Sequence, residues 1–184
     1  MRQVNRLHAT LGAALAALGI ASCFTAAAAD GDASYSAEIS VAEIMESMVM
    51  PAAQQLWDAV GVDVTAQGEI EKKPETDEQW AQLRAAAVTL AEASNALLVP
   101  GRHAAPAGAP AEESDAELSP AKIEALLAAQ RPAWAAHAQV LRVTAMQALA
   151  AVDARDIERI TEVGGAIDEA CEGCHLQFWY PEQN

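Results

Sequence analysis

The residues best suited to chemistry stand near the C-terminal end of the chain, in the run Cys171-Glu172-Gly173-Cys174-His175. On an α-helix, Cys174 lies about 60° to one side of Cys171 and His175 about 40° to the other, so the three side chains share an arc of roughly 100°. A C-x-x-C-H run is typical of haem c attachment, in which each thiol adds to a vinyl group and the imidazole binds the iron. The motif therefore predicts one covalent haem c, held by Cys171 and Cys174, with His175 as an axial ligand.

Other uses of a C-x-x-C pair find less support in the rest of the chain. A structural zinc site needs two further ligands, and no second C-x-x-C or H-x-x-x-H follows the pair. A thioredoxin-like redox pair needs strands beside it, which a helical sequence does not offer. Haem attachment is the interpretation that remains.

A helix must carry the motif, and the preceding residues predict one. Apolar or small residues recur at spacings of three and four, which is the pattern of one helix face: Ile157, Ile160, Gly164, Ile167, Cys171 and Cys174. We predict a helix from Asp153 to about Gln177. Because the cysteines continue its apolar stripe, the helix is expected to turn the haem toward the protein interior.

The first of three further helices is predicted over about residues 36–60, from apolar residues spaced for one face. Pro51 interrupts it. Proline lacks a backbone donor and crowds the carbonyl four residues earlier, here that of Ser47, so a kink or break is expected near Met48. Glycines in the stretch 61–68 mark a loop after this helix.

The remaining helices are predicted from their start and stop signals. The second begins at a Thr76-x-x-Gln79 capping box and ends before a flexible connection at about 99–119, rich in Ala, Pro, Gly and acids. The third begins with Pro120 and restarts at Pro132. The fold predicted is all-α, a four-helix antiparallel bundle with one long connection and the haem on the C-terminal helix.

Composition agrees with one helical domain. The chain has 184 residues, 52% of them apolar and only 4% aromatic. That length supports one sizeable core, and abundant alanine favours closely packed helices over strands built from aromatic and β-branched residues. The expected domain covers residues 30–184.

The N-terminal residues 1–29 predict an export signal. Two arginines precede an apolar run at 11–21, and no acid occurs before Asp30. The alanines just before Asp30 suit ordinary signal peptidase, whereas the residues ahead of Cys23 resemble a lipoprotein cleavage site. We therefore predict a periplasmic protein, or a lipid-anchored one facing the periplasm if Cys23 carries lipid.

The charge predicts the kind of partner. The formal net charge is −15, and removal of residues 1–29 takes away two basic and no acidic residues. Such a field repels nucleic acid and anionic membranes, and it raises the encounter rate with cations. We expect a redox partner protein with a basic docking surface, no nucleic acid, and membrane contact only through a lipidated Cys23.

Taken together, these features resemble the class II c-type cytochromes, the cytochrome c prime group and its low-spin methionine-ligated relatives. The resemblance covers about residues 36–180. It rests on the motif 171–175 in the last helix, on Ile44-Met45-Glu46-Ser47-Met48 in the first helix, and on the long connection. It implies the four-helix bundle, and a possible homodimer through the first two helices.

In that group the first helix faces the iron opposite the histidine, and this face is either open or closed by methionine. Met45 resembles the methionine ligand, and Met48, one turn on, is the alternative sixth ligand; both could instead fill the core. The chain departs from high-spin members, which follow the motif with Tyr-Arg, where this chain has Gln-Phe-Trp-Tyr-Pro at 177–181. We expect the aromatic residues 178–180 to pack under the haem or to cap the helix end.

Two other histidines could in principle bind iron. His137 lies near an aromatic residue in the third helix, and His103 lies in the Pro/Gly-rich connection. A lone histidine is more often a half-buried or surface residue than a metal ligand. We expect neither His137 nor His103 to bind the iron.

The function predicted is one-electron transfer in the periplasm, with histidine and methionine bound to the iron. The alternative is a five-coordinate haem module that binds NO or CO in an apolar pocket. An enzyme is not expected, because the first helix offers no evident acid or base over the iron: Glu43 and Glu46 are expected to be solvated.

Overall fold

The computed structural model describes residues 35–109 and 117–180. The predicted export signal, Cys23 and part of the 99–119 connection lie outside these ranges. Within them, no helix is both long enough and apolar enough to cross a membrane.

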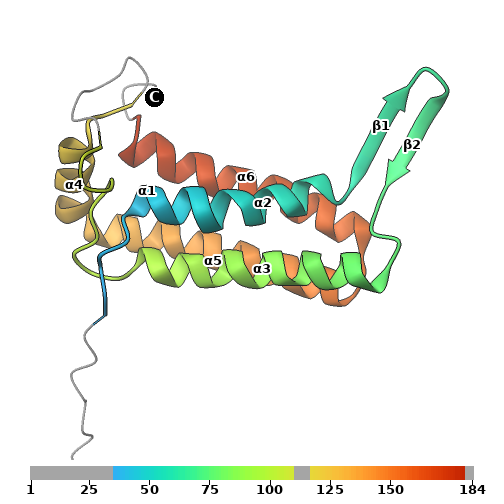
Figure 1. Ribbon diagram of the computed structural model, residues 1–184, viewed down its shortest axis with the longest axis horizontal. Coiled ribbons are helices and arrows are strands. Elements are labelled where there is room, and N and C mark those ends of the chain that lie inside the picture. Colours follow the sequence, from blue (N-terminus) through green and yellow to red (C-terminus); the bar gives the residue numbers. More distant parts are fainter. Residues whose placement is uncertain (1–34, 110–116, 181–184) are drawn as a thin grey trace, which may run out of the picture. The chain divides into compact units, whose positions relative to one another are not determined.

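Helices make up most of the described chain, so the expectation of a mainly helical protein is confirmed. In chain order the elements are α1 (Val41–Ile44), the π-helix η1 (Met45–Val49), α2 (Met50–Asp58), β1 (Gly61–Thr65), β2 (Gly68–Lys72), α3 (Asp77–Leu97), α4 (Pro120–Ala129), α5 (Arg131–Asp153) and α6 (Ile157–Phe178). Figure 1 shows α2, α3, α5 and α6 running side by side, with α4 across one end of them.

Capping residues explain where the long helices begin. Thr76 and Gln79 form the predicted capping box, in which each side chain accepts a hydrogen bond from the other residue's backbone N–H. Ser40 and Glu43 form a second box, so the first helix begins at Val41 and not near residue 36. In α6 the side chain of Asp156 accepts from the backbone N–H of Arg159, so this helix begins at Ile157, four residues after the predicted Asp153, which belongs to α5.

Of the kink or break expected near Met48, ahead of Pro51, the break does not occur. The chain stays helical and widens into η1, in which the backbone N–H of Met50 bonds to the carbonyl of Met45, five residues back. Proline cannot donate to the carbonyl of Ser47 and crowds it, and a π-turn just upstream relieves this conflict without ending the helix.

The stretch predicted as a loop after the first helix forms an antiparallel hairpin instead. Gly61 pairs with Lys72 and Thr65 with Gly68. Figure 1 shows the hairpin extending away from the helices, and its residues are nearly all exposed. Its apolar side chains therefore add little to the core, which is why a search for buried periodicity overlooked it.

The described part of the long connection is anchored to the start of the first helix. The backbone N–H groups of Val41 and Ala42 donate to the carbonyls of His103 and Ala104, at 2.9 and 3.0 Å. Ala104 is buried, although it lies in the connection that the sequence predicted to be flexible. The predicted restart at Pro132 is confirmed, because α5 begins one residue before that proline.

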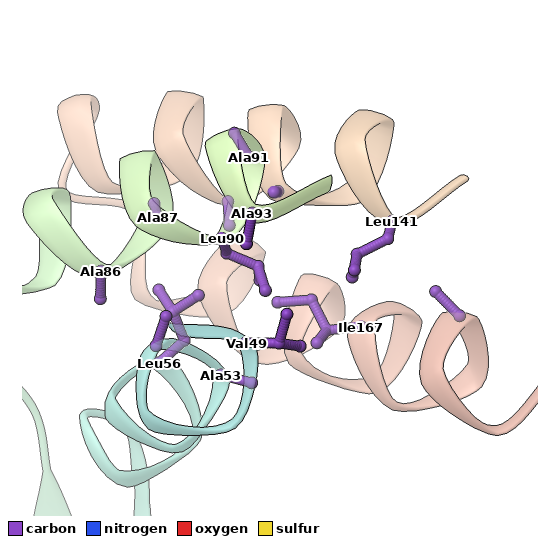
Figure 2. Close-up of a cluster of buried hydrophobic side chains, with 14 of the residues drawn as sticks. Val49, Ala53, Leu56, Ala86, Ala87, Leu90, Ala91, Ala93, Leu141 and Ile167 are labelled. Carbon is purple, nitrogen blue, oxygen red and sulfur yellow. The ribbon is translucent and has the colours of Figure 1, made fainter. Parts of the chain in front are cut away.

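The core lies where α2, α3, α5 and α6 meet. Figure 2 shows Leu56 of α2, Leu90 of α3 and Ile167 of α6 directed toward one another, with alanines on the facing surface of α3. Leu90 and Ile167 are fully buried. The small alanine side chains allow the helices to approach closely, as the composition predicted.

Leu90→Ala should lower the free energy of unfolding by about 2–5 kcal/mol, because the lost methyl groups leave a cavity between packed helices. The matched control is Val88→Ala on the same helix, where the side chain is partly exposed and the cost should stay near about 0.5 kcal/mol. Chemical denaturation measures both. Equal losses for the two variants would contradict this account of the core.

Candidate haem-binding site

The three residues of the attachment motif line one cleft. Cys171, Cys174 and His175 line it from α6, and Met45 lines it from η1. Apolar residues of α2, α3 and α5 complete the walls, among them Ala53, Leu97, Trp134 and Leu141. The cleft has a volume of about 190 Å³, which is below the roughly 300–1,000 Å³ common for ligand sites.

The two thiols of the motif are free and largely shielded from water. Burial, with a smaller contribution from Asp168, raises the pKa of Cys171 to about 11. Burial and the neighbouring Cys171 raise the pKa of Cys174 to about 12. Redox-active C-x-x-C pairs typically have a thiol of lowered pKa, so these two cysteines lack the electrostatic signature of a disulfide oxidoreductase.

The imidazole of His175 is half-buried near the end of α6. Burial lowers its pKa, and the carboxylates of Glu172 and Glu117 partly oppose that shift. The neutral ring that results is the form that binds metal ions. Its ring lies against those of Trp179 and Tyr180, with centroid distances of 6.0 and 5.9 Å.

Of the two candidate methionines, only Met45 lines the cleft. Met48 packs against the core outside the cleft lining, whereas Met50, which the sequence analysis did not single out, lines the cleft and is 53% exposed. The π-helix explains the difference. Its hydrogen bonds join residues five apart, so Met45 and Met50 share a side that ordinary helical spacing would assign to Met45 and Met48.

The two other histidines have different surroundings. His103 lies away from the cleft, with its Nδ1 3.1 Å from Glu124. His137 lines the cleft, and its Nε2 lies 2.8 Å from the amide oxygen of Gln177, whose own amide nitrogen donates to Gln130. His137 is therefore a cleft residue that sequence reasoning undervalued, since its position depends on how α5 packs on α6.

The aromatic residues 178–180 end the helix and do not line the cleft. Phe178 is fully buried and meets Trp134 edge-on, with ring centroids 5.5 Å apart. Trp179 stacks on Trp134 with ring centroids 6.4 Å apart, and its carbonyl accepts a hydrogen bond from the backbone N–H of Leu118. Of the two roles expected for these residues, capping the helix end agrees with this packing.

The surface around the cleft is acidic. Asp168 and Glu172 belong to the lining itself. The segments 35–60 and 160–180, which contribute most of the cleft, contain no lysine or arginine, while carboxylates stand at positions 38, 43, 46, 58, 162, 168, 169 and 172. Glu43 serves the capping box of α1, whereas Glu46 is exposed, as expected.

The donor set of the cleft suits a haem. Among the described residues, no three His, Cys, Asp or Glu side chains converge on a point where they could hold a bare metal ion. A haem brings its iron within a macrocycle, so two thiols for attachment and one or two axial ligands are sufficient. Cys171, Cys174, His175 and Met45 provide this set around an apolar space.

No protein-family model matches the chain, and neither a curated protein nor a solved structure was found to match it.

Proposed function

We propose that this protein is an exported class II type cytochrome c, a four-helix antiparallel bundle that carries one electron on a covalent haem and is not an enzyme. The observation that carries the proposal is the single cleft that contains the whole attachment motif, from α6, together with Met45, from η1. These residues are far apart in the sequence. A methionine in the same apolar cleft as a C-x-x-C-H motif is the arrangement that a haem ligated by histidine and methionine requires.

Each residue has a definite role in this proposal. Cys171 and Cys174 would hold the haem through two thioethers, and His175 and Met45 would be the protein ligands of its iron. The bound iron supplies the change between ferrous and ferric states. Apolar walls from α2, α3 and α5 exclude water and limit rearrangement, and methionine opposite histidine raises the reduction potential, which suits a carrier.

The alternative is a five-coordinate haem that binds NO or CO. It keeps the same attachment and histidine, and it requires that Met45 does not reach the iron. Its specific support is the solvent-open mouth beside the exposed Met50, through which a small gas could enter.

The proposal is tested by the optical spectrum of the protein matured in a bacterial periplasm. We expect haem staining that survives a denaturing gel, a low-spin ferric spectrum, and little uptake of carbon monoxide by the reduced protein. Absence of covalent haem would refute the proposal. A high-spin spectrum with ready uptake of carbon monoxide would favour the gas-binding alternative.

We further propose that the electron partner of this periplasmic protein is basic and docks at the cleft mouth. Support comes from the carboxylates of the segments 35–60 and 160–180, which no lysine or arginine in those segments offsets. Opposite charges accelerate encounter, and they do so less as salt is added.

Asp168→Asn combined with Glu172→Gln should slow oxidation of the reduced protein by tris(1,10-phenanthroline)cobalt(III), a cationic oxidant, by about three- to tenfold at low ionic strength. Oxidation by the ferricyanide anion should become faster. The control is Glu69→Gln with Glu92→Gln, the same charge change on the hairpin and on α3, for which both rates should move little. Stopped-flow absorbance measures these rates, and equal effects of the two double variants would argue against docking at the cleft mouth.

A further inference from the structure

The position of Met45 relative to His175 depends on how far α2 and η1 are displaced along α6. Met45 lies in η1 and His175 in α6. A slip between the two helices would carry Met45 away from His175. Some contact must therefore hold the register.

One side chain links the two helices by a specific hydrogen bond. The indole Nε1–H of Trp57, in α2, donates to the backbone carbonyl of Gly164, in α6, at 2.9 Å. Trp57 is half-buried, and it lines both the haem cleft and the shallow hollow beside Gly164. A directional bond from a rigid ring to one particular carbonyl permits only one register, unlike the nondirectional packing of alanines and leucines nearby.

Gly164 leaves room for this approach. A Cβ atom at this position would stand 3.3 Å from Cδ1 and 3.8 Å from Nε1 of the Trp57 ring. The first distance is tighter than most Cβ contacts, so a methyl group there would require the indole to move by a few tenths of an ångström. At the next residue, Gly165, a Cβ would meet nothing within 4 Å.

The spacing along the two helices connects this contact to the iron site. Met45 precedes Trp57 by about 18 Å of helix, and Gly164 precedes His175 by about 16 to 17 Å, at 1.5 Å per residue. Because Trp57 meets Gly164 while Met45 and His175 share the cleft, the two segments run in opposite directions over nearly equal lengths. Holding one end in register therefore sets the other.

We propose that Trp57 and Gly164 are positioning residues, a register lock that holds Met45 in place opposite His175. This inference rests on the proposed haem function. Neither residue touches the iron in this account; each acts through the placement of η1. Loss of the lock lets α2 sample other registers, in which the thioether of Met45 no longer reaches its place.

The test compares Gly164→Ala and Trp57→Phe with Gly165→Ala, all in the full haem-loaded chain. Trp57→Phe keeps an aromatic ring and removes the donor, and loss of one hydrogen bond corresponds to about a five- to tenfold change in a two-state equilibrium. We expect the fraction of reduced protein open to carbon monoxide to rise by about that factor in Gly164→Ala and Trp57→Phe, with a lowered reduction potential. Gly165→Ala should match the wild type.

A merely structural role is distinguished by the same series. If Gly164→Ala and Trp57→Phe lower the melting temperature but leave carbon monoxide uptake and potential as in the wild type, the register lock is wrong. A wild-type spectrum that is already high-spin refutes methionine ligation instead.

If the wild-type spectrum is high-spin, the register of α2 against α6 is measured directly. Spin labels are attached at Gln54→Cys on α2 and at Glu169→Cys on α6, and the distance between them is determined. If the wild type carries no haem, the same labels are read in a background of Cys171→Ser and Cys174→Ser. A distance distribution that broadens in Gly164→Ala and not in Gly165→Ala supports the lock. Identical distributions in the two variants overturn it.

Discussion

Replacing both Cys171 and Cys174 by serine is expected to abolish covalent haem retention. A hydroxyl forms no thioether with a haem vinyl group under the conditions of cytochrome maturation, and serine is otherwise close in size to cysteine. Haem stain on a denaturing gel, normalised to protein, should fall to background. Both sulfurs line the cleft near His175, so no other described cysteine can substitute for them.

The single variants Cys171→Ser and Cys174→Ser serve as controls. Each keeps one thioether, so each should keep measurable stain and show a shifted ferrous absorption band. Circular dichroism reports whether the double variant still folds, since Cys174 belongs to the same buried cluster as Leu90 and Ile167 and Cys171 packs against that cluster. Unchanged staining of the double variant would overturn the central proposal.

The second large effect is expected from Met45→Ala. In a methionine-ligated haem the open form is a minor state, populated at roughly 0.1–10%. Removing the ligand makes that form dominant, so the apparent affinity of the reduced protein for carbon monoxide should rise by about 10- to 1,000-fold. The ferric spectrum should change from low-spin to high-spin, and the reduction potential should fall.

Met48→Ala is the matched control, because it removes the same side chain three residues away, outside the cleft lining. Its spectrum and its affinity for carbon monoxide should match those of the wild type, with a loss of stability from the packing that Met48 contributes. The opposite result, a spin change in Met48→Ala and none in Met45→Ala, would assign the iron to Met48. No spin change in either variant would show that neither methionine binds the iron.

Local signals in the sequence were sufficient to predict where a helix begins when capping residues or proline mark its start. The capping box at Thr76 and Gln79 and the restart at Pro132 depend on neighbouring residues only, and both are found where predicted. The box at Ser40 and Glu43 has the same signature and could have been used to begin the first helix correctly.

Other features could not be obtained from helical periodicity. The β1–β2 hairpin exposes its apolar residues, so no buried stripe marks it. The chain can accommodate Pro51 either by a break in the helix or by a widened helical turn. The widened turn is found, because it keeps Val49, before the proline, and Ala52 and Leu56, after it, in the core. That choice depends on packing against other helices.

The sequence by itself determined that Cys171, Cys174 and His175 share one helix face, because residues three and four apart on a helix lie on the same side. Cys171, Cys174 and His175 would point together in any protein in which this segment is helical. Only the tertiary structure decided that Met45, His137 and Trp57 line the same cleft. Their places depend on the π-turn and on the relative register of separate helices, and these follow from packing and single hydrogen bonds between residues distant in the chain.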